Sequence, residues 1–337
     1  MKYKHRTAFV FLLIIFFAAL VFLLNIGFGS ARIGVREIIA ILFSGADSGG
    51  TDALIIFKIR LPRALAALAC GTSLAVSGYL LQTFFNNPIV EPYILGISSG
   101  ATLFVGFVIL GGMRLGFVTI SPQFIFAGAF IGSLLIMLLI LFASRRVKSM
   151  ITLLIIGLMT GYLCGAGVNI LSAFAEKEQI ARFYMWSMGS FAPFTMEQTK
   201  LLYVIILPSV FASMLLSKQI NALAMGESYA LSMGINVKTA RQLIIIISSI
   251  LCAAVTAFAG PVSFIGLAAP HICRILFRTA NSRILIPACC ATGALMALFC
   301  DFIARNIVQP IELPLGAITA IIGAPIVVWL LSRKETA

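Results

Sequence analysis

The stretch Thr7–Ala31, TAFVFLLIIFFAALVFLLNIGFGSA, contains no charged residue and directly follows Lys2, Lys4 and Arg6. A helix needs about 20 apolar residues to cross the hydrocarbon core of a bilayer, where only a helix satisfies all its own backbone groups. A secretory signal has a shorter apolar core of about 7–15 residues. We therefore expect this stretch to be a retained membrane span with its basic flank in the cytoplasm.

The composition of the whole chain agrees with a lipid environment. Of the 337 residues, 61% are hydrophobic and only 10% are charged, whereas a soluble domain has about 25% charged residues. The net charge of +13 could attract nucleic acid. Because the basic residues lie in short loops between apolar runs, the positive-inside bias of membrane proteins is the preferred explanation, and we expect no nucleic-acid partner.

Further apolar runs of membrane-spanning length divide the chain into ten predicted spans. The run 242–273 is too long for one span and is interrupted by Gly260-Pro261 and again by Pro270. We divide it into a span ending near residue 261 and a shorter helix ending near residue 278. The predicted fold is an all-α polytopic membrane protein forming one domain over residues 1–337. The remaining spans are predicted at 7–31, 64–90, 92–113, 115–144, 149–175, 201–217, 284–300 and 313–332.

The charge distribution supports an even number of spans. With the N-terminus in the cytoplasm, the inner loops and termini hold 14 of the 24 basic residues and 3 of the 11 acids. The net charge is then 14 − 3 = +11 inside and 10 − 8 = +2 outside. This asymmetry predicts that both termini are cytoplasmic.

Residues that could carry chemistry are scarce. The 7 cysteines lie in or beside apolar runs without a Cys-x-x-Cys pair, and there are only 2 histidines. We therefore expect small buried thiols, no metal site and no cofactor. The chain also lacks a Gly-Lys dipeptide, which excludes a P-loop. Glycines within the spans, such as Gly71 and Gly78, predict close helix packing.

Two polar segments interrupt the first half of the chain. Arg60-Leu-Pro-Arg63 precedes the second span, where proline fits the first turn of a helix. Its two arginines would be either interface anchors or a docking site for an acidic partner. Beyond this span, the polar loop Gln82–Pro92 contains two prolines and leads into the Gly/Ser-rich stretch Leu95–Ala101. Irregular backbone at membrane depth is tolerated only inside protein or beside a cavity, so this loop is a candidate gate.

Three more segments lie in the second half. Residues 218–241 form the longest polar inner stretch, and their glycines predict two short helices. This stretch would either rest on the headgroups or dock a cytoplasmic partner. Gly260–Arg274 is rich in proline and glycine. Asp301 and Arg305 are four residues apart, which predicts an ion pair within one helix.

Together these segments resemble the FecCD/BtuC-type permeases of ABC importers for iron–siderophores, haem and cobalamin. The resemblance covers nearly the whole chain in the family's order. Departures are modest: Ile89-Val90 stands where the family has Leu-Ala, Met225 where leucine is common, and Ser263 where glycine is frequent. The matching segments are Arg60–Arg63, Asn87–Ala101, Met225–Ile235, Gly260–Arg274, Asp301–Arg305 and Glu312–Gly316.

The resemblance implies a permease that works with several partners in a bacterial cytoplasmic membrane. It implies a second permease subunit (the same chain or a paralogue), a cytoplasmic ABC ATPase dimer and an extracytoplasmic substrate-binding protein. The substrate favoured by the resemblance is an iron–siderophore-type chelate, with haem and cobalamin as alternatives. The family's functional positions fall on Arg60, Arg63 and Arg305 for binding-protein docking, on Gly226, Glu227, Ala230 and Gly234 for ATPase coupling, and on Asn87, Pro88 and Ile89 for the cytoplasmic gate.

Two other functions were considered. A secondary transporter usually carries ionisable residues in mid-membrane to bind a coupling ion. The acids of this chain lie in loops or at span ends, and the predicted spans 64–90, 115–144 and 149–175 contain none. An intramembrane enzyme would need a nucleophile with its base, or a metal cluster, and the sequence shows neither. We therefore expect a transport subunit without enzymatic activity of its own.

Overall fold

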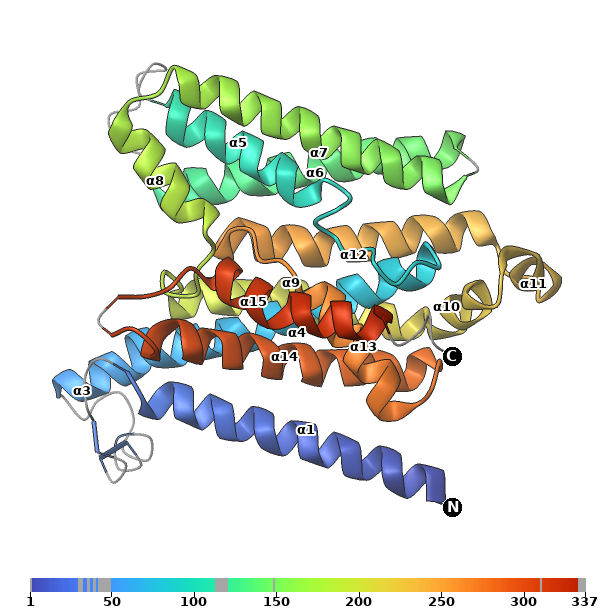
Figure 1. The fold of residues 1–337 in the computed structure, drawn as a ribbon, viewed down its shortest axis with the longest axis horizontal. Coiled ribbons are helices and arrows are strands. Elements are labelled where there is room, and N and C mark those ends of the chain that lie inside the picture. Colours follow the sequence, from blue (N-terminus) through green and yellow to red (C-terminus); the bar gives the residue numbers. More distant parts are fainter. Residues whose placement is uncertain are drawn as a thin grey trace.

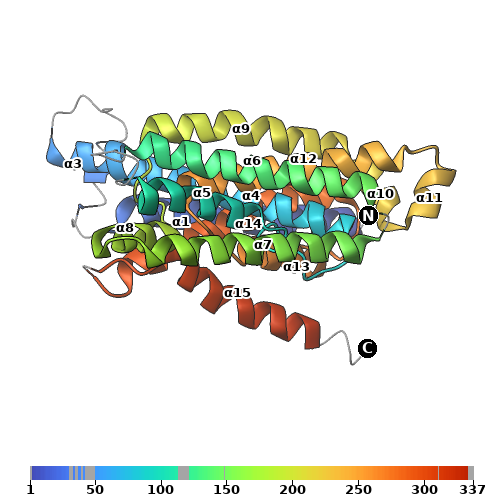
Figure 2. The same cartoon turned by 90° about the horizontal axis from the view of Figure 1, so that it is seen from above.

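The computed structural model describes residues 2–29, 33–34, 37–38, 41, 50–112, 121–147, 149–309 and 311–332. All regular elements in these ranges are helices, and most of the long ones run along the longest axis of the molecule (Figures 1 and 2). In chain order they are α1 (Lys2–Gly27), α3 (Thr51–Leu54), the π-helix η2 (Ile55–Arg60), α4 (Leu61–Phe84), α5 (Ile97–Gly111), α6 (Pro122–Arg146), α7 (Met150–Ala173), α8 (Lys177–Ser187), α9 (Met196–Leu215), α10 (Ser217–Ala224), α11 (Glu227–Ser232), α12 (Val237–Ala259), α13 (Ile265–Phe277), α14 (Ser282–Asn306) and α15 (Leu315–Ser332).

These helices confirm the all-α membrane fold. Within the described ranges, 7 helices are long and apolar enough to cross a membrane. Three shorter apolar helices, α5, α13 and α15, lie where the other predicted spans were placed. Every predicted span therefore contains a helix, while the number of ten transmembrane crossings stays a prediction.

The predicted start of the second span, at residue 64, was wrong. One continuous helical stretch runs from Thr51 through η2 to Phe84. The charged residues Lys58, Arg60 and Arg63 precede the uncharged run in the sequence, but the helix continues through all three of them. Pro62 lies in the first turn of α4, as expected. The helix also stops earlier than predicted, because the backbone leaves it at Phe85.

Helix α4 is the centre of the bundle. It contacts α9, α12, α13 and α14. In the most apolar 18-residue stretch of the continuous helix Thr51–Phe84, 83% of the stretch is buried, compared with 11% of the corresponding stretch of α1. Glycines allow its closest contacts. A Cβ on Gly71 would lie 2.2 Å from the Gly293 carbonyl oxygen of α14, and one on Gly78 would lie 1.9 Å from the Gly266 oxygen of α13. Only glycine permits such backbone approach, as the small-residue pattern predicted.

The predicted break at Gly260-Pro261 is confirmed, whereas Pro270, the second predicted interruption of the run 242–273, lies inside the helix α13. Helix α12 ends at Ala259, and Gly260 follows with a φ of 74° that favours glycine. The chain is then irregular until α13 begins at Ile265. Phe264, immediately before α13, has a φ of 68°, which is uncommon for a residue with a side chain. The two helices are therefore separate elements joined by a constrained turn.

The elongated bundle has two ends that carry different short helices (Figure 1). Helix α3 and the N-terminus of α4 lie at one end, and α10 and α11 lie at the other (Figure 1). We name them the α3 end and the α11 end. The N-terminus of α1 lies at the α11 end (Figure 1). Helix α8, which was not predicted, lies near the α3 end; its capping box of Glu176 and Gln179 was the available sequence signal.

Candidate functional site

The first candidate site is a cluster of charged side chains at the α3 end. The Arg63 guanidinium donates to Asp301 of α14 through Nε at 3.0 Å and through Nη2 at 2.9 Å. Its Nη1 donates to Glu312 Oε1 at 2.8 Å, in the connection between α14 and α15. Arg305 Nε lies 3.4 Å from Asp301 Oδ2, which confirms the predicted pair within one helix. Asp301 is thus the counter-ion of both Arg63 and Arg305.

The other contacts of this cluster hold the end of α1. Arg60 Nη1 donates to the carbonyl oxygens of Ile26 and Gly27 at 2.8 and 2.9 Å. Arg305 Nη2 donates to the Oδ1 of Asn25 at 2.6 Å and to its carbonyl oxygen at 3.0 Å. The last carbonyls of a helix lack partners within the helix and carry partial negative charge. The two arginines therefore cap the C-terminus of α1.

The structure thus brings the three predicted docking arginines together, with most of their side-chain surface covered by other parts of the chain. Arg60 is 3% and Arg63 is 5% exposed, so their side chains are not exposed as interface anchors would be, while their place at the outer side of the membrane stays a prediction. Their charges are accommodated by carboxylates and helix-end carbonyls instead of by water. Glu312 is the one acid of the cluster with a largely exposed side chain, at 48%. The pairing of Arg63 with Asp301 and Glu312 had no signal in the sequence, since 238 and 249 residues separate them.

The second candidate site is loop 85–96, which connects α4 to α5 and contains the predicted gate residues. Asn86 has a φ of 46°, and the side chain of Asn87 accepts a hydrogen bond from the Ile89 N–H at 3.0 Å. Such an Asx turn stabilises the backbone without a helix. Pro88 follows in the same turn, and the Ile89 side chain remains 49% exposed. The loop therefore exposes the apolar side chain of Ile89 on a backbone that the Asx turn holds in place.

Farther along the loop, Glu91 is buried and anchors it to the turn before α13. Glu91 Oε2 accepts a hydrogen bond from the Phe264 N–H at 3.2 Å. Burial raises the pKa of Glu91 to about 7, although the hydrogen bond from Phe264 opposes this shift. Two irregular segments of the chain, 85–96 and 260–264, are therefore joined through one carboxylate.

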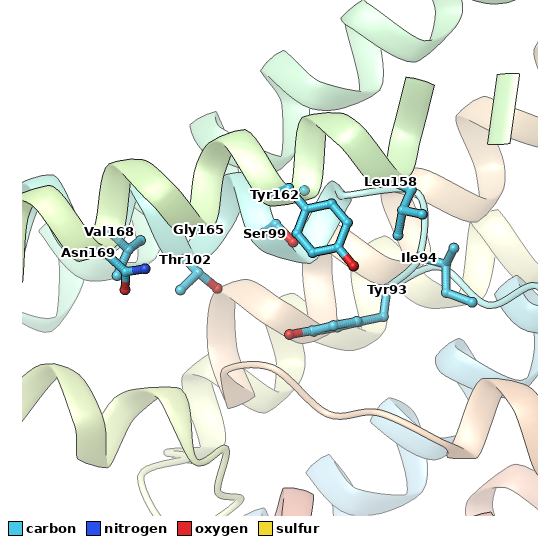
Figure 3. A pocket seen from close by; sticks show the side chains of 10 residues that line it. Tyr93, Ile94, Ser99, Thr102, Leu158, Tyr162, Gly165, Val168 and Asn169 are labelled. Carbon is cyan, nitrogen blue, oxygen red and sulfur yellow. The ribbon is translucent and has the colours of Figure 1, made fainter. Parts of the chain in front are cut away.

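The loop also borders a cavity of about 510 Å³ between α5 and α7 (Figure 3). Tyr93 and Ile94 of the loop and Tyr162 of α7 face one another across it, with the phenol rings of the two tyrosines projecting into the space (Figure 3). Ser99, Thr102 and Asn169 supply the other polar groups, and its lining contains no charged side chain. Such a wall can accept a bulky solute without binding it tightly. Sequence reasoning did not identify this wall.

The third candidate site is segment 218–241, at the α11 end. It folds into the predicted short helices α10 and α11, with Gly226 at a φ of 112° and Gly234 at a φ of 73°. Both φ values favour glycine, which explains these two positions. Ala230 is completely buried against Ala222. It therefore holds α11 against α10 and does not itself face a partner.

The exposed face of this segment carries charge and apolar surface. Glu227, the first residue of α11, forms an ion pair with Arg241 of α12. Around it lie apolar side chains that are more than 40% exposed: Met225, Tyr229, Leu231 and Met233. An exposed cluster of large apolar residues usually marks an interaction site. The sequence pattern of this segment predicted an apolar face of leucine, methionine and alanine, and the structure adds Tyr229 to it. In the described part of the chain, no three potential ligands form a metal site.

Known proteins resemble this chain along most of its length. The FecCD transport family matches residues 14–333. The haemin transport system permease protein HmuU of Yersinia pestis is 35% identical over 317 residues, which is 94% of each chain. The vitamin B12 import system permease protein BtuC of Klebsiella pneumoniae is 36% identical over 282 residues, covering 84% of this chain and 83% of that protein.

The fold is also similar to a solved structure. A metal-chelate-type ABC transporter, determined in an inward-facing conformation, superimposes with a TM-score of 0.85 at 29% sequence identity. The superposition covers 96% of this chain and 99% of the other. The helix arrangement described above is therefore that of an ABC permease.

Proposed function

The chain belongs to the FecCD transport family as a permease subunit of an ABC importer, and from this premise we propose that it carries an iron–siderophore-type chelate across the bacterial inner membrane. The observation that supports the proposal most is the family match over residues 14–333. Haem and cobalamin have equal support, because relatives at 35% and 36% identity are named for haemin and vitamin B12 transport. All three cargoes enclose a metal ion in an organic ligand.

The uncharged cavity beside loop 85–96 is consistent with such a cargo. A chelated metal ion is shielded by its ligand, so the path needs room and weak polarity more than counter-charges. The lining of tyrosine, serine, threonine and asparagine side chains offers both. We place the cytoplasmic gate at Asn87, Pro88 and Ile89, in the loop that borders this cavity.

ATP hydrolysis requires a separate subunit, and segment 218–241 is our proposed contact with it. Its exposed apolar side chains would enter a groove of the ATPase, as amphipathic helices commonly do. Gly226 and Gly234 would define the segment's shape and Glu227 its charge, while Ala230 would hold the two helices together. This assignment places the α11 end and both chain termini in the cytoplasm.

At the opposite end, we propose that the substrate-binding protein docks over the arginine cluster. Arg60, Arg63 and Arg305 supply three positive charges, and Asp301 and Glu312 supply two negative ones. The remaining positive charge would attract acidic groups of the partner. Because Arg63 is buried, a partner carboxylate could reach its Nη1 only by displacing the exposed Glu312.

Transport in a reconstituted system tests the proposal. The permease would be purified with its ATPase, placed in liposomes and supplied with binding protein loaded with a ferric siderophore, haem or cobalamin. We expect ATP-dependent uptake of one of the three. Uptake driven by a proton gradient without the ATPase would contradict the proposal, as would the absence of ATP-dependent uptake of every chelate.

A further inference from the structure

The inner end of α4 lies between the proposed gate and the proposed coupling segment, and side chains connect all three. The last residue of α4, Phe84, directly precedes loop 85–96 and is 5% exposed. Movement of the coupling segment can therefore reach the gate through α4 if something joins the segment to this helix end. Two separate side-chain connections do so.

The first connection runs from α11 through α12. Glu227 is ion-paired with Arg241, whose guanidinium lies over the ring of Phe84, 6.0 Å from its centroid. A guanidinium at this distance from an aromatic face is attracted to it. The Arg241 side chain is only 16% exposed, so it is enclosed between the coupling helix and α4. Glu227 thereby reaches the residue next to the gate through one intermediate side chain.

The second connection runs from α10 through the start of α14. The Oδ1 of Asn221 accepts hydrogen bonds from the backbone N–H and the hydroxyl of Ser282, at 2.8 and 2.6 Å. The Ser282 hydroxyl in turn accepts from the Tyr79 hydroxyl of α4 at 2.8 Å. Tyr79 and Ser282 are 2% and 1% exposed. The Tyr79–Ser282 hydrogen bond is buried and the Ser282–Asn221 bonds are partly buried, so water replaces a lost partner least easily at Tyr79.

A cavity of about 240 Å³ lies between the two proposed functional segments. Asn86, Asn87 and Pro88 of the loop line it together with Ala224 of α10 and Tyr79 of α4. The cavity separates the loop from α10 at this point, so the two do not pack against each other there and the loop has room to move. A displacement of the coupling segment can then reach the loop through α4, against which α10 packs directly and to which the two side-chain connections join the segment.

The geometry points to Arg241 and Tyr79 as positioning residues that couple segment 218–241 to the gate loop through the inner end of α4. The inference rests on the proposed function, because it presupposes that this segment receives the motion of the ATPase. It adds the residues that transmit the motion within this chain. Neither residue touches the cargo in this role, and each acts through α4.

The ratio of ATP hydrolysed to chelate transported tests the inference. The variants Arg241→Gln and Tyr79→Phe would be measured in liposomes with the ATPase and loaded binding protein. We expect ATP hydrolysis to persist while the ratio rises by at least about threefold in each variant. Arg241→Lys, which retains the positive charge, should restore part of the coupling. Arg145→Gln removes an exposed positive charge from the last turn of α6, outside segment 218–241, and should leave the ratio unchanged.

A second measurement separates transmission from general damage to the fold. Spin labels at Ser228→Cys in α11 and at Ile89→Cys in the loop would report each segment's nucleotide-dependent movement. In Tyr79→Phe we expect α11 to move as in the parent and the loop to move less.

A normal ratio and normal loop movement in both variants, in a complex whose parent transports, would overturn this inference alone. A parent without ATP-dependent uptake would instead contradict the proposed function. If Arg241→Gln fails to assemble, Tyr79→Phe decides the question, because it removes only one hydroxyl.

Discussion

At the scale of single residues, the buried carboxylate of the arginine cluster at the α3 end is paired. Asp301 is 1% exposed and contacts both Arg63 and Arg305, which matters because isolated charges are very costly away from water. The exposed pair of Glu178 and Arg182 differs from this cluster, since its side chains are 75% and 62% exposed. Exposed pairs contribute little to stability because water and salt screen them.

The Asp301→Asn variant should therefore destabilise the protein strongly. It leaves two buried arginines without their shared counter-charge, and breaking a buried ion pair typically costs about 3–5 kcal/mol. Thermal unfolding of the detergent-solubilised permease would measure the change. Glu178→Gln is the matched control, for which we expect a change of at most about 0.5 kcal/mol. Equal unfolding temperatures for the two variants would show that the cluster does not stabilise α1 and α14.

The role of Glu312 can be tested without disturbing the buried cluster. Reversing the charge of Arg60, Arg63 or Arg305 would disrupt the fold, because each holds α1 or α14. Glu312→Gln instead removes the exposed competitor for Arg63 Nη1. We expect the binding protein to associate about two- to fivefold more tightly, with a stronger dependence on salt. Association measured at two salt concentrations checks this. Weaker or unchanged association would argue against docking through Arg63.

Glu91 predicts a pH effect on stability. Its pKa of about 7 in the folded protein exceeds the usual 4.5, so the folded state holds this proton more tightly than the unfolded state. The resulting stabilisation is complete below pH 4.5 and is lost as the pH rises through 7. The unfolding temperature should therefore fall between pH 5 and pH 8 more steeply in the parent than in Glu91→Gln. Parallel pH profiles for the two proteins would contradict the assignment.

At the scale of elements, close backbone contacts determine how the helices pack. Gly71 and Gly293 let α4 and α14 approach closely, and Gly78 and Gly266 do the same for α4 and α13. In lipid, such contacts matter because helices gain little from burying apolar surface that lipid covers equally well. Glycine alone does not identify a contact, however. Gly165 of α7 has no atom near the position of a Cβ and borders the large cavity.

Alanine substitutions at two helical glycines should consequently have opposite effects on stability. In Gly71→Ala the new Cβ would meet the Gly293 carbonyl at 2.2 Å, so α4 and α14 must separate, at a cost of about 1–3 kcal/mol. In Gly165→Ala the space is open, and alanine is the better helix former by about 1 kcal/mol. Thermal unfolding of both variants beside the parent measures the difference. A stabilised Gly71→Ala would show that the two helices do not pack as described.

At the scale of the whole molecule, the two ends carry different chemistry. The α3 end holds the buried arginine cluster, and the α11 end holds exposed apolar side chains and the proposed coupling segment. Loop 85–96 borders two cavities, one lined by α5 and α7 and the other lined in part by Ala224 of α10 at the α11 end. This arrangement suits a permease that receives cargo at one face and the effect of ATP hydrolysis at the other.

Cysteine labelling in intact cells tests the orientation. Ser228→Cys places a thiol on α11, and Arg182→Cys places one on the exposed face of α8 near the α3 end. A membrane-impermeant maleimide should label position 182 in intact cells and position 228 only after permeabilisation. The native thiols give low background, since six are buried and Cys290 is partly buried. Labelling of both positions from the same side would contradict the proposed orientation.

Much of this organisation could be predicted from the chain. Apolar runs locate the helices because the length of a span is determined by the bilayer. Gly260-Pro261 identified the break between α12 and α13, and the glycines of segment 218–241 identified two short helices. Helix ends were less accurate, as the start at Thr51 instead of residue 64 shows, because a charge can be buried when another element supplies its partner.

The sequence by itself determined the lipid environment, the all-helical fold and the segments that resemble a permease family, since these follow from composition, periodicity and local backbone preference. Only the tertiary structure decided that Arg60 and Arg63 are buried, that Asp301 serves two arginines and that Arg241 and Tyr79 connect α4 to the coupling segment. Each of these facts depends on side chains brought together from distant parts of the chain. Local sequence encodes which groups a helix presents, but not which helix will lie opposite.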